Sequence, residues 1–142
     1  MNKVFLDTNI LVYAFDRSAG DKHTLAVKLV EECWENENGC LSIQVLQEIF
    51  VSITRKISTP LDHQTARQIV ADLAHWRLQS PDASDLLQAI DLQQSYQLCF
   101  WDAMGVQSAT HFGCRQLLSE DLNHGQVYGK VQVINPFREV DC

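Results

Sequence analysis

The sequence predicts an α/β fold, a three-layer αβα sandwich built on a central, mainly parallel sheet. Short apolar segments alternate with longer segments of helical periodicity along nearly the whole chain. Parallel neighbouring strands need crossover connections, and helices in those connections cover both faces of the sheet. The 142 residues suffice for one buried core, and no linker, repeat or low-complexity segment divides them, so we expect a single domain over residues 1–142.

The first half of the chain is predicted to contain two short strands and three helices. In order, they are a strand over 3–6, helices over 10–15 and 22–38, a strand over 40–42, and a helix from 43 to about 56. The first strand stops at residues 7–9, Asp-Thr-Asn, which are residue types that favour turns and helix caps. Gly39 ends the second helix, and Ser42 can cap the third.

The second half is predicted to begin with helices and to end with strands. In order, they are helices over 61–78, 84–96 and 101–112, a strand over 115–118 and a strand over 131–134. The helices repeat apolar residues three and four positions apart, and Gly113 stops the last of them. The apolar face of residues 61–78 could be a core face or an interface, because the two look identical in sequence.

Composition limits the classes of function. The formal net charge is −7, with 18 acidic against 11 basic residues, which argues against a protein that binds nucleic acid simply by neutralising phosphates. A nuclease remains possible, because bound divalent cations reverse the local charge of an acidic site. The apolar start of the chain is interrupted by Asp7 and Asn9, unlike a signal peptide, and no segment is long enough to span a membrane, so we expect a cytoplasmic protein.

The cysteines and histidines favour neither a disulfide framework nor a zinc site. The five cysteines are odd in number and contain no C-x-x-C pair, so we predict reduced thiols; they are Cys33, Cys40, Cys99, Cys114 and Cys142. The five histidines lack H-E-x-x-H spacing, which argues against a zinc hydrolase, and nothing pairs two imidazoles for metal-free cleavage of RNA.

Several acidic residues follow predicted strands, where the ligand sites of open parallel sheets lie. Asp7 and Asp121 come just after strands, and Asp102 stands in the first turn of a helix that follows the short apolar run 98–100. We therefore expect these three acids at one edge of the sheet. Glu48 lies about six residues into its helix and away from the apolar stripe, where it could face the same cleft or solvent.

Each acid also has a structural explanation when it is taken alone. Asp7 could be a helix cap, Asp102 could compensate a helix dipole, Glu48 could be a solvated helix residue, and Asp121 could build a turn. Together they predict more, because converging carboxylates without Lys or Arg partners repel one another unless a hard cation such as Mg²⁺ or Mn²⁺ is present. Phosphotransfer through Asp7 is disfavoured, since no second Asp stands two residues on.

The amino-acid sequence of five segments resembles the PIN domain, and more narrowly the VapC toxins of bacterial type II toxin–antitoxin pairs. The segments are V-F-L-D-T-N-I-L-V-Y at 4–13, L-S-I-Q-V-L-Q-E at 41–48, W-D-A at 101–103, L-L-S-E-D-L-N-H-G at 117–125 and N-P-F at 135–137. They occur in order from residue 4 to residue 137, so the resemblance covers nearly the whole chain and implies the same fold class.

The resemblance implies a Mg²⁺-dependent endoribonuclease with a catalytic acidic quartet of Asp7, Glu48, Asp102 and Asp121. As a hypothesis, Asp7, Asp102 and Asp121 hold one or two Mg²⁺ ions, with Mn²⁺ as the alternative, while Glu48 completes the shell or orients the attacking water. An RNA substrate, a cognate antitoxin protein and a homodimer are implied in the same way. The alternative is a non-catalytic RNA-binding or regulatory module that keeps the fold.

The same resemblance suggests supporting roles around the acids. Thr8 and Asn9 fall in the first motif, where the Thr8 hydroxyl would orient the groups that bind the metal, and Ser119 would do so from the other side. The helix after Asp102 departs from the apolar pattern expected of the family, because Gly105 and Gln107 interrupt it. Asp102 itself is intact at its place in the motif.

Overall fold

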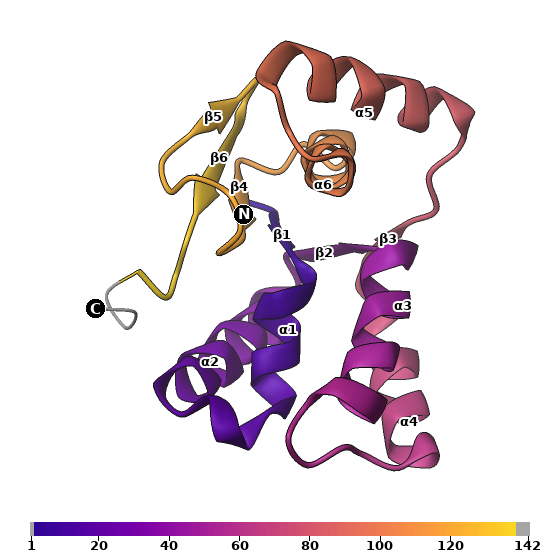
Figure 1. Ribbon diagram of the computed structural model, residues 1–142, viewed down its shortest axis with the longest axis vertical. Coiled ribbons are helices and arrows are strands. Elements are labelled where there is room, and N and C mark those ends of the chain that lie inside the picture. Colours follow the sequence, from indigo (N-terminus) through magenta and orange to yellow (C-terminus); the bar gives the residue numbers. More distant parts are fainter. Residues whose placement is uncertain (1, 139–142) are drawn as a thin grey trace.

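A six-stranded sheet lies between two groups of helices in the computed structural model, which describes residues 2–138 (Figure 1). The strand order is β3-β2-β1-β4-β6-β5, and every neighbouring pair is parallel except β5 and β6. The strands are β1 Val4–Leu6, β2 Gly39–Ser42, β3 Arg77–Gln79, β4 Gln116–Leu118, β5 Val127–Tyr128 and β6 Val131–Ile134.

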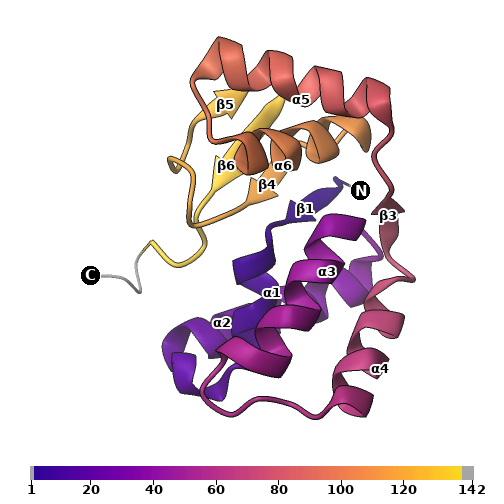
Figure 2. The ribbon, with the colours of Figure 1, turned by 45° about the vertical axis from the view of Figure 1, so that its right-hand side comes forward.

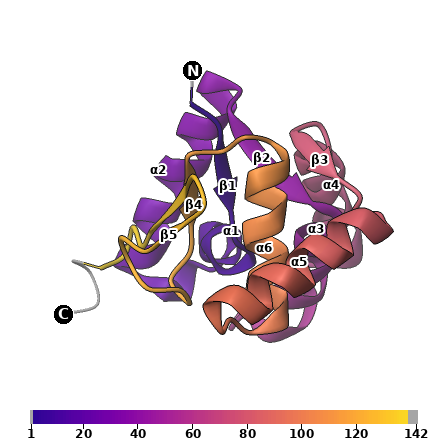
Figure 3. The same ribbon diagram turned by 90° about the horizontal axis from the view of Figure 1, so that it is seen from above.

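The helices form the two outer layers (Figures 1 and 2). They are α1 Thr8–Phe15, α2 Asp21–Asn36, α3 Ile43–Val51, α4 His63–Leu73, α5 Ala83–Tyr96 and α6 Phe100–His111. Helices α1 to α4 lie on one side of the sheet, while α6 lies against the other side and α5 packs on α6 (Figure 3). The predicted three-layer αβα sandwich with a mainly parallel sheet is therefore confirmed.

The register of the central strands fixes the edge at which the candidate site forms. Leu6 at the end of β1 pairs with Leu118 at the end of β4, so the two chains leave the sheet side by side. The side chains of Leu6 and Phe5 are completely or almost completely buried, which holds β1 in the core. The residues that follow these two strands are consequently brought together by backbone pairing alone.

Residues 61–78 do not form one helix, so this prediction is wrong at its end. Helix α4 stops at Leu73, and Arg77–Gln79 is instead the edge strand β3, parallel to β2. Trp76 and Leu78 continue the helical spacing in the sequence, but the free edge of β2 offers the backbone hydrogen bonds that a strand needs. The start of the segment faces the core, with Ala66 fully buried.

The other differences from the predicted elements are smaller. Strand β5 was not expected; it pairs with β6 as an antiparallel hairpin, with Gly129 at a positive φ of 63° in the turn. The apolar run 98–100 leads directly into α6, since Leu98 and Cys99 lie in a loop and Phe100 already begins the helix. The helix at 43 to about 56 consists of α3 and a π-helical continuation, Ser52–Lys56.

Cys33, Cys40, Cys99 and Cys114 are free thiols, and Cys142 lies outside the described residues. Over residues 2–138, none of the helices has both the length and the apolar character that a membrane crossing needs.

Candidate metal centre at the carboxyl ends of the strands

Three of the predicted acids converge on one point. Asp7, Asp102 and Asp121 each place a carboxylate oxygen so that the three atoms lie within 4.8 Å of one another. Each residue comes from a different part of the fold: the cap of α1, the first turn of α6, and the turn after β4. The structure thus assembles an all-oxygen donor set from residues that are far apart in the chain.

Asp7 is held in place by three hydrogen bonds. Its backbone N–H donates to the Leu118 carbonyl oxygen at 3.0 Å, which continues the pairing of β1 with β4 past Leu6. Its Oδ1 accepts from the Thr8 backbone N–H at 2.8 Å, and its Oδ2 accepts from the Ser119 hydroxyl at 3.0 Å. Asp7 is therefore both the cap of α1 and a member of the acidic cluster, and the two explanations are compatible.

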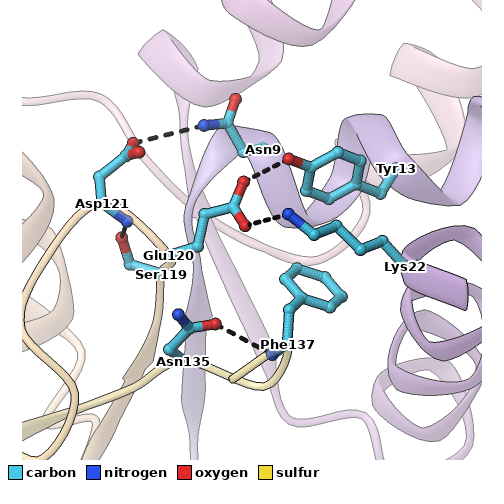
Figure 4. Close-up of polar contacts among 8 residues, drawn as sticks. All are labelled: Asn9, Tyr13, Lys22, Ser119, Glu120, Asp121, Asn135 and Phe137. Atoms are coloured by element: carbon cyan, nitrogen blue, oxygen red, sulfur yellow. Dashed lines mark hydrogen bonds and ion pairs between the residues drawn. The ribbon is translucent and has the colours of Figure 1, made fainter. Parts of the chain in front are cut away.

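Asp121 is fixed by a turn and by an amide from α1. Its backbone N–H donates to Ser119 Oγ at 3.2 Å, and its Oδ2 accepts from Asn9 Nδ2 at 3.3 Å (Figure 4). The fully buried Ser119 hydroxyl thereby contacts both Asp7 and the backbone of Asp121. Ser119 and Asn9 thus contact two of the three aspartates, while their supporting roles at a metal stay predictions.

Asp102 is positioned by the packing of its helix. Its neighbours Ala103 and Val106 are fully buried, so α6 is fixed against the sheet with its first turn at the edge where Asp7 lies. The positive end of the helix dipole favours a carboxylate in that first turn. The dipole role and membership of the cluster again coincide in one residue.

The electrostatics of the cluster favour a bound cation. The pKa of Asp7 is raised from 3.8 to about 6, chiefly by burial; the charges of Asp121 and Asp102 contribute to the rise, and the hydrogen bonds from Thr8 and Ser119 oppose it. Burial and the charge of Asp121 also raise the pKa of Asp102. A divalent ion would remove this cost, because it stabilises the charged forms of all three carboxylates.

Glu48 lies outside this group. Its side chain is exposed, and its Oε1 accepts a hydrogen bond from Gln44 Nε2 at 2.8 Å, one turn earlier on α3. This agrees with the predicted position of Glu48 away from the apolar stripe of its helix. The structure brings together the three aspartates and not the full predicted quartet, so a role for Glu48 stays a prediction.

Thr8 provides a further observation beside the cluster. Its side chain is buried, and its hydroxyl oxygen has no hydrogen-bond partner among the described residues. Buried hydroxyls are normally paired, so an unpaired one next to a carboxylate indicates a missing polar group such as a bound water or ion. Together with the all-oxygen donor set, it fits a hard cation such as Mg²⁺ or Mn²⁺.

A second polar cluster, formed by Tyr13, Lys22 and Glu120, lies next to Asp121 and was not predicted from the sequence. The Glu120 carboxylate accepts a hydrogen bond from the Tyr13 hydroxyl and forms an ion pair of 2.9 Å with Lys22 Nζ (Figure 4). Tyr13 and Lys22 lie 107 and 98 residues from Glu120, respectively, so no local motif links them. Only the juxtaposition of α1 and α2 with the turn after β4 reveals their contact.

Gln107 is buried and hydrogen-bonded where α6 packs against its neighbours. Its side chain is only 1% exposed; its Oε1 accepts from Gln79 Nε2 at 3.0 Å and its Nε2 donates to Asp85 Oδ1 at 3.0 Å. A buried amide is tolerable when it is paired in this way. Gln107 therefore joins α6 to α5 and to the edge strand β3 instead of disturbing the layer.

Comparison with known families gives an assignment that agrees with this architecture. The model of the PIN domain matches residues 4–130, which is most of the chain. The chain belongs to the PIN domain family. No curated protein matches its sequence.

Solved structures with the same fold include bacterial toxins. A toxin–antitoxin complex from Klebsiella pneumoniae superposes with a TM-score of 0.69 at 19% identity, covering 94% of this PIN domain chain and 98% of the other. The DNA-bound VapBC of Salmonella typhimurium gives 0.65 at 14% identity, with 94% and 97% covered. VapC20 of Mycobacterium tuberculosis, a sarcin–ricin loop cleaving toxin, gives 0.60 at 20% identity, with 81% and 87% covered.

Proposed function

We propose that this PIN domain protein is a metal-dependent endoribonuclease and the toxin of a toxin–antitoxin pair. The observation that carries the proposal is the convergence of Asp7, Asp102 and Asp121 within 4.8 Å. Three carboxylates that repel one another, beside a buried hydroxyl that has no hydrogen-bond partner within residues 2–138, form a poor structural element but a suitable cation site. We propose Mg²⁺ as the resident ion, with Mn²⁺ able to replace it.

The chain's own residues would hold the ion and orient the groups around it. Asp7, Asp102 and Asp121 would bind the ion, and Ser119 would keep Asp7 and Asp121 at their spacing through its two hydrogen bonds. When bound, the ion would lower the pKa of a water nucleophile and neutralise charge on the RNA phosphate. Glu48 would approach from α3 to orient that water, as the resemblance implies.

The structural neighbours support the toxin part of the proposal. Two are toxin–antitoxin assemblies, and VapC20 is described as cleaving the sarcin–ricin loop. We extend to this chain an RNA substrate, a cognate antitoxin as partner, a homodimeric state and a cytoplasmic location. Size-exclusion chromatography with light scattering of the purified chain tests the homodimer, and the same measurement after co-expression with a candidate antitoxin tests the partner.

A cleavage assay tests the enzymatic proposal. The purified chain is incubated with structured RNA in Mg²⁺, in Mn²⁺ and in EDTA, together with the variant Asp121→Asn and the matched control Asp91→Asn on the exposed face of α5. We expect products only with metal, none from Asp121→Asn, and wild-type rates from Asp91→Asn. RNA binding without products in any metal would instead identify a non-catalytic module, and cleavage in EDTA would refute the metal centre.

A further inference from the structure

Glu120 lies between two residues of the acidic cluster's supporting turn, but its side chain points elsewhere. The Ser119 hydroxyl donates to Asp7. Asp121 accepts from Asn9, whereas the Glu120 carboxylate points toward α1 and α2 (Figure 4). The group of converging carboxylates accordingly contains Asp121 and not Glu120. Asp121 and Glu120 are neighbours in the chain, so contacts elsewhere in the fold must determine that Asp121 and not Glu120 faces the metal centre.

Two donors hold the Glu120 carboxylate. The Tyr13 hydroxyl donates to Oε1, and Lys22 Nζ lies 2.9 Å from Oε2, so both oxygens are engaged by different helices. The site is sheltered, because the side chains of Lys22 and Glu120 are only 25% and 14% exposed. Charge-assisted hydrogen bonds of this kind are stronger and geometrically more restrictive than neutral ones.

The C-terminal N-P-F segment supports these two donors. The fully buried Phe137 ring meets the Tyr13 ring edge to face, with centroids 5.2 Å apart, and Lys22 Nζ lies 5.8 Å from the centroid of the Phe137 ring. Asn135 Oδ1 accepts from the Phe137 backbone N–H at 2.9 Å, which shapes the turn that presents the ring (Figure 4). The N-P-F segment is not part of the acidic cluster. Its contacts are instead with Tyr13 and Lys22, the two residues that bind Glu120.

We propose that Tyr13 and Lys22 are positioning residues for Asp121. They bind the Glu120 carboxylate on the side of α1 and α2, with Phe137 packed against both, and so fix the turn that directs Asp121 at the metal centre. Without them, the turn can rotate and Glu120 can compete with Asp121 for the centre. This inference rests on the proposed function only in that the centre binds a divalent ion.

Calorimetric titration of the full chain with Mn²⁺ tests the inference directly. Tyr13→Phe keeps the ring contact with Phe137 and removes only the hydroxyl, and Lys22→Met keeps most of the side chain and removes the charge. We expect each to weaken Mn²⁺ affinity about tenfold, at the lower end of the effect of groups that orient metal ligands. Lys22→Arg should recover most of the affinity, and the kcat for RNA should fall while KM changes little.

Matched controls separate positioning from general stability. Tyr96→Phe and Lys3→Met make the same changes at sites where the hydroxyl accepts from the Gly129 N–H and the ammonium donates to the Phe112 carbonyl oxygen, rather than to Glu120. Both should keep wild-type Mn²⁺ affinity. If Tyr13→Phe and Lys22→Met lower the melting temperature without changing Mn²⁺ affinity or kcat, the two residues only stabilise the fold and the inference is overturned.

A double variant tests whether the effect passes through Glu120. In a Glu120→Ala background the carboxylate is gone, so adding Tyr13→Phe should cause no further loss of Mn²⁺ affinity. An additive loss would overturn the proposed route. If the wild-type chain itself binds no Mn²⁺ and cleaves no RNA, the proposed function fails and takes this inference with it, whereas an active wild type with unaffected variants refutes the inference alone.

Discussion

The Ser119 hydroxyl lies 3.0 Å from Asp7 Oδ2, although 112 residues separate the two in the chain. The contact follows from the parallel pairing of β1 with β4, which places the first residue after each strand next to the other. Because Ser119 Oγ also accepts from the Asp121 backbone N–H, one buried hydroxyl sets the spacing of two of the three aspartates.

Ser119→Ala should therefore weaken the metal centre more than it weakens the fold. We expect about a tenfold loss of Mn²⁺ affinity, since the two carboxylate-bearing segments lose their shared hydrogen-bond partner. Isothermal titration calorimetry measures the affinity, and Ser95→Ala on the exposed face of α5 is the matched control. An unchanged affinity would show that the strand pairing alone positions the aspartates.

Asp7→Asn should stabilise the metal-free protein at neutral pH. The raised pKa of about 6 means that the folded chain binds a proton more tightly than the unfolded chain, so the free energy of unfolding falls as pH rises from about 4 to 6 and then levels. Asparagine avoids this cost, and we expect a gain of about 2 kcal/mol at neutral pH that fades toward pH 4. Urea unfolding in EDTA measures it; a variant less stable than wild type at neutral pH would contradict the burial of a charged Asp7.

The same pKa predicts how metal affinity depends on pH. Below about pH 6 Asp7 holds a proton that the ion must displace, so the apparent Mn²⁺ association constant should rise with pH up to about 6 and then flatten. Titrations across this range give the curve. Asp7→Asn, which has no proton to lose there, should bind weakly and show a shallower dependence, and an identical slope in both proteins would remove Asp7 from the centre.

Glu48 and Asp102 should behave differently on substitution, because only Asp102 belongs to the converging group. We expect Asp102→Asn to lose most of its Mn²⁺ affinity, while Glu48→Gln keeps it and lowers only the rate of RNA cleavage. Calorimetry and single-turnover kinetics separate the two effects. If Glu48→Gln loses affinity as severely as Asp102→Asn, Glu48 must leave its contact with Gln44 and bind the ion directly.

Two glycines should respond to alanine in opposite directions. A Cβ on Gly39 would lie 2.3 Å from Cε3 of Trp76, so Gly39→Ala should cost about 1 to 3 kcal/mol through overpacking. A Cβ on Gly105, in the interior of α6, would have no atom of the described part of the chain within 4 Å beyond its own helix backbone and chain neighbours, so Gly105→Ala should stabilise by up to about 1 kcal/mol. Thermal unfolding measures both, and a stable Gly39→Ala would show that Trp76 moves aside freely.

Local residue patterns predict much of this fold because they report on local energetics. The apolar runs at β1, β4 and β6 and the helical spacing of α2, α3 and α5 all lie where the sequence places them. The pattern fails at β3 and β5, which are short edge strands whose existence depends on an already formed neighbour. Trp76 illustrates the ambiguity, because its apolar spacing fits a helix while its ring lies over Gly39 at the start of β2.

The sequence by itself determines which residues follow the strands, and hence that Asp7 and Asp121 stand at the same edge of the sheet. It cannot decide which acids meet, because that depends on side-chain direction set by contacts between distant segments. The tertiary structure places Asp102 beside Asp7 and Asp121. It leaves Glu48 hydrogen-bonded to Gln44, and it turns the Glu120 carboxylate toward Tyr13 and Lys22. A helix or strand depends mainly on residues close together in the sequence. A site at the edge of the sheet forms only when the helices pack on the sheet and bring distant side chains together.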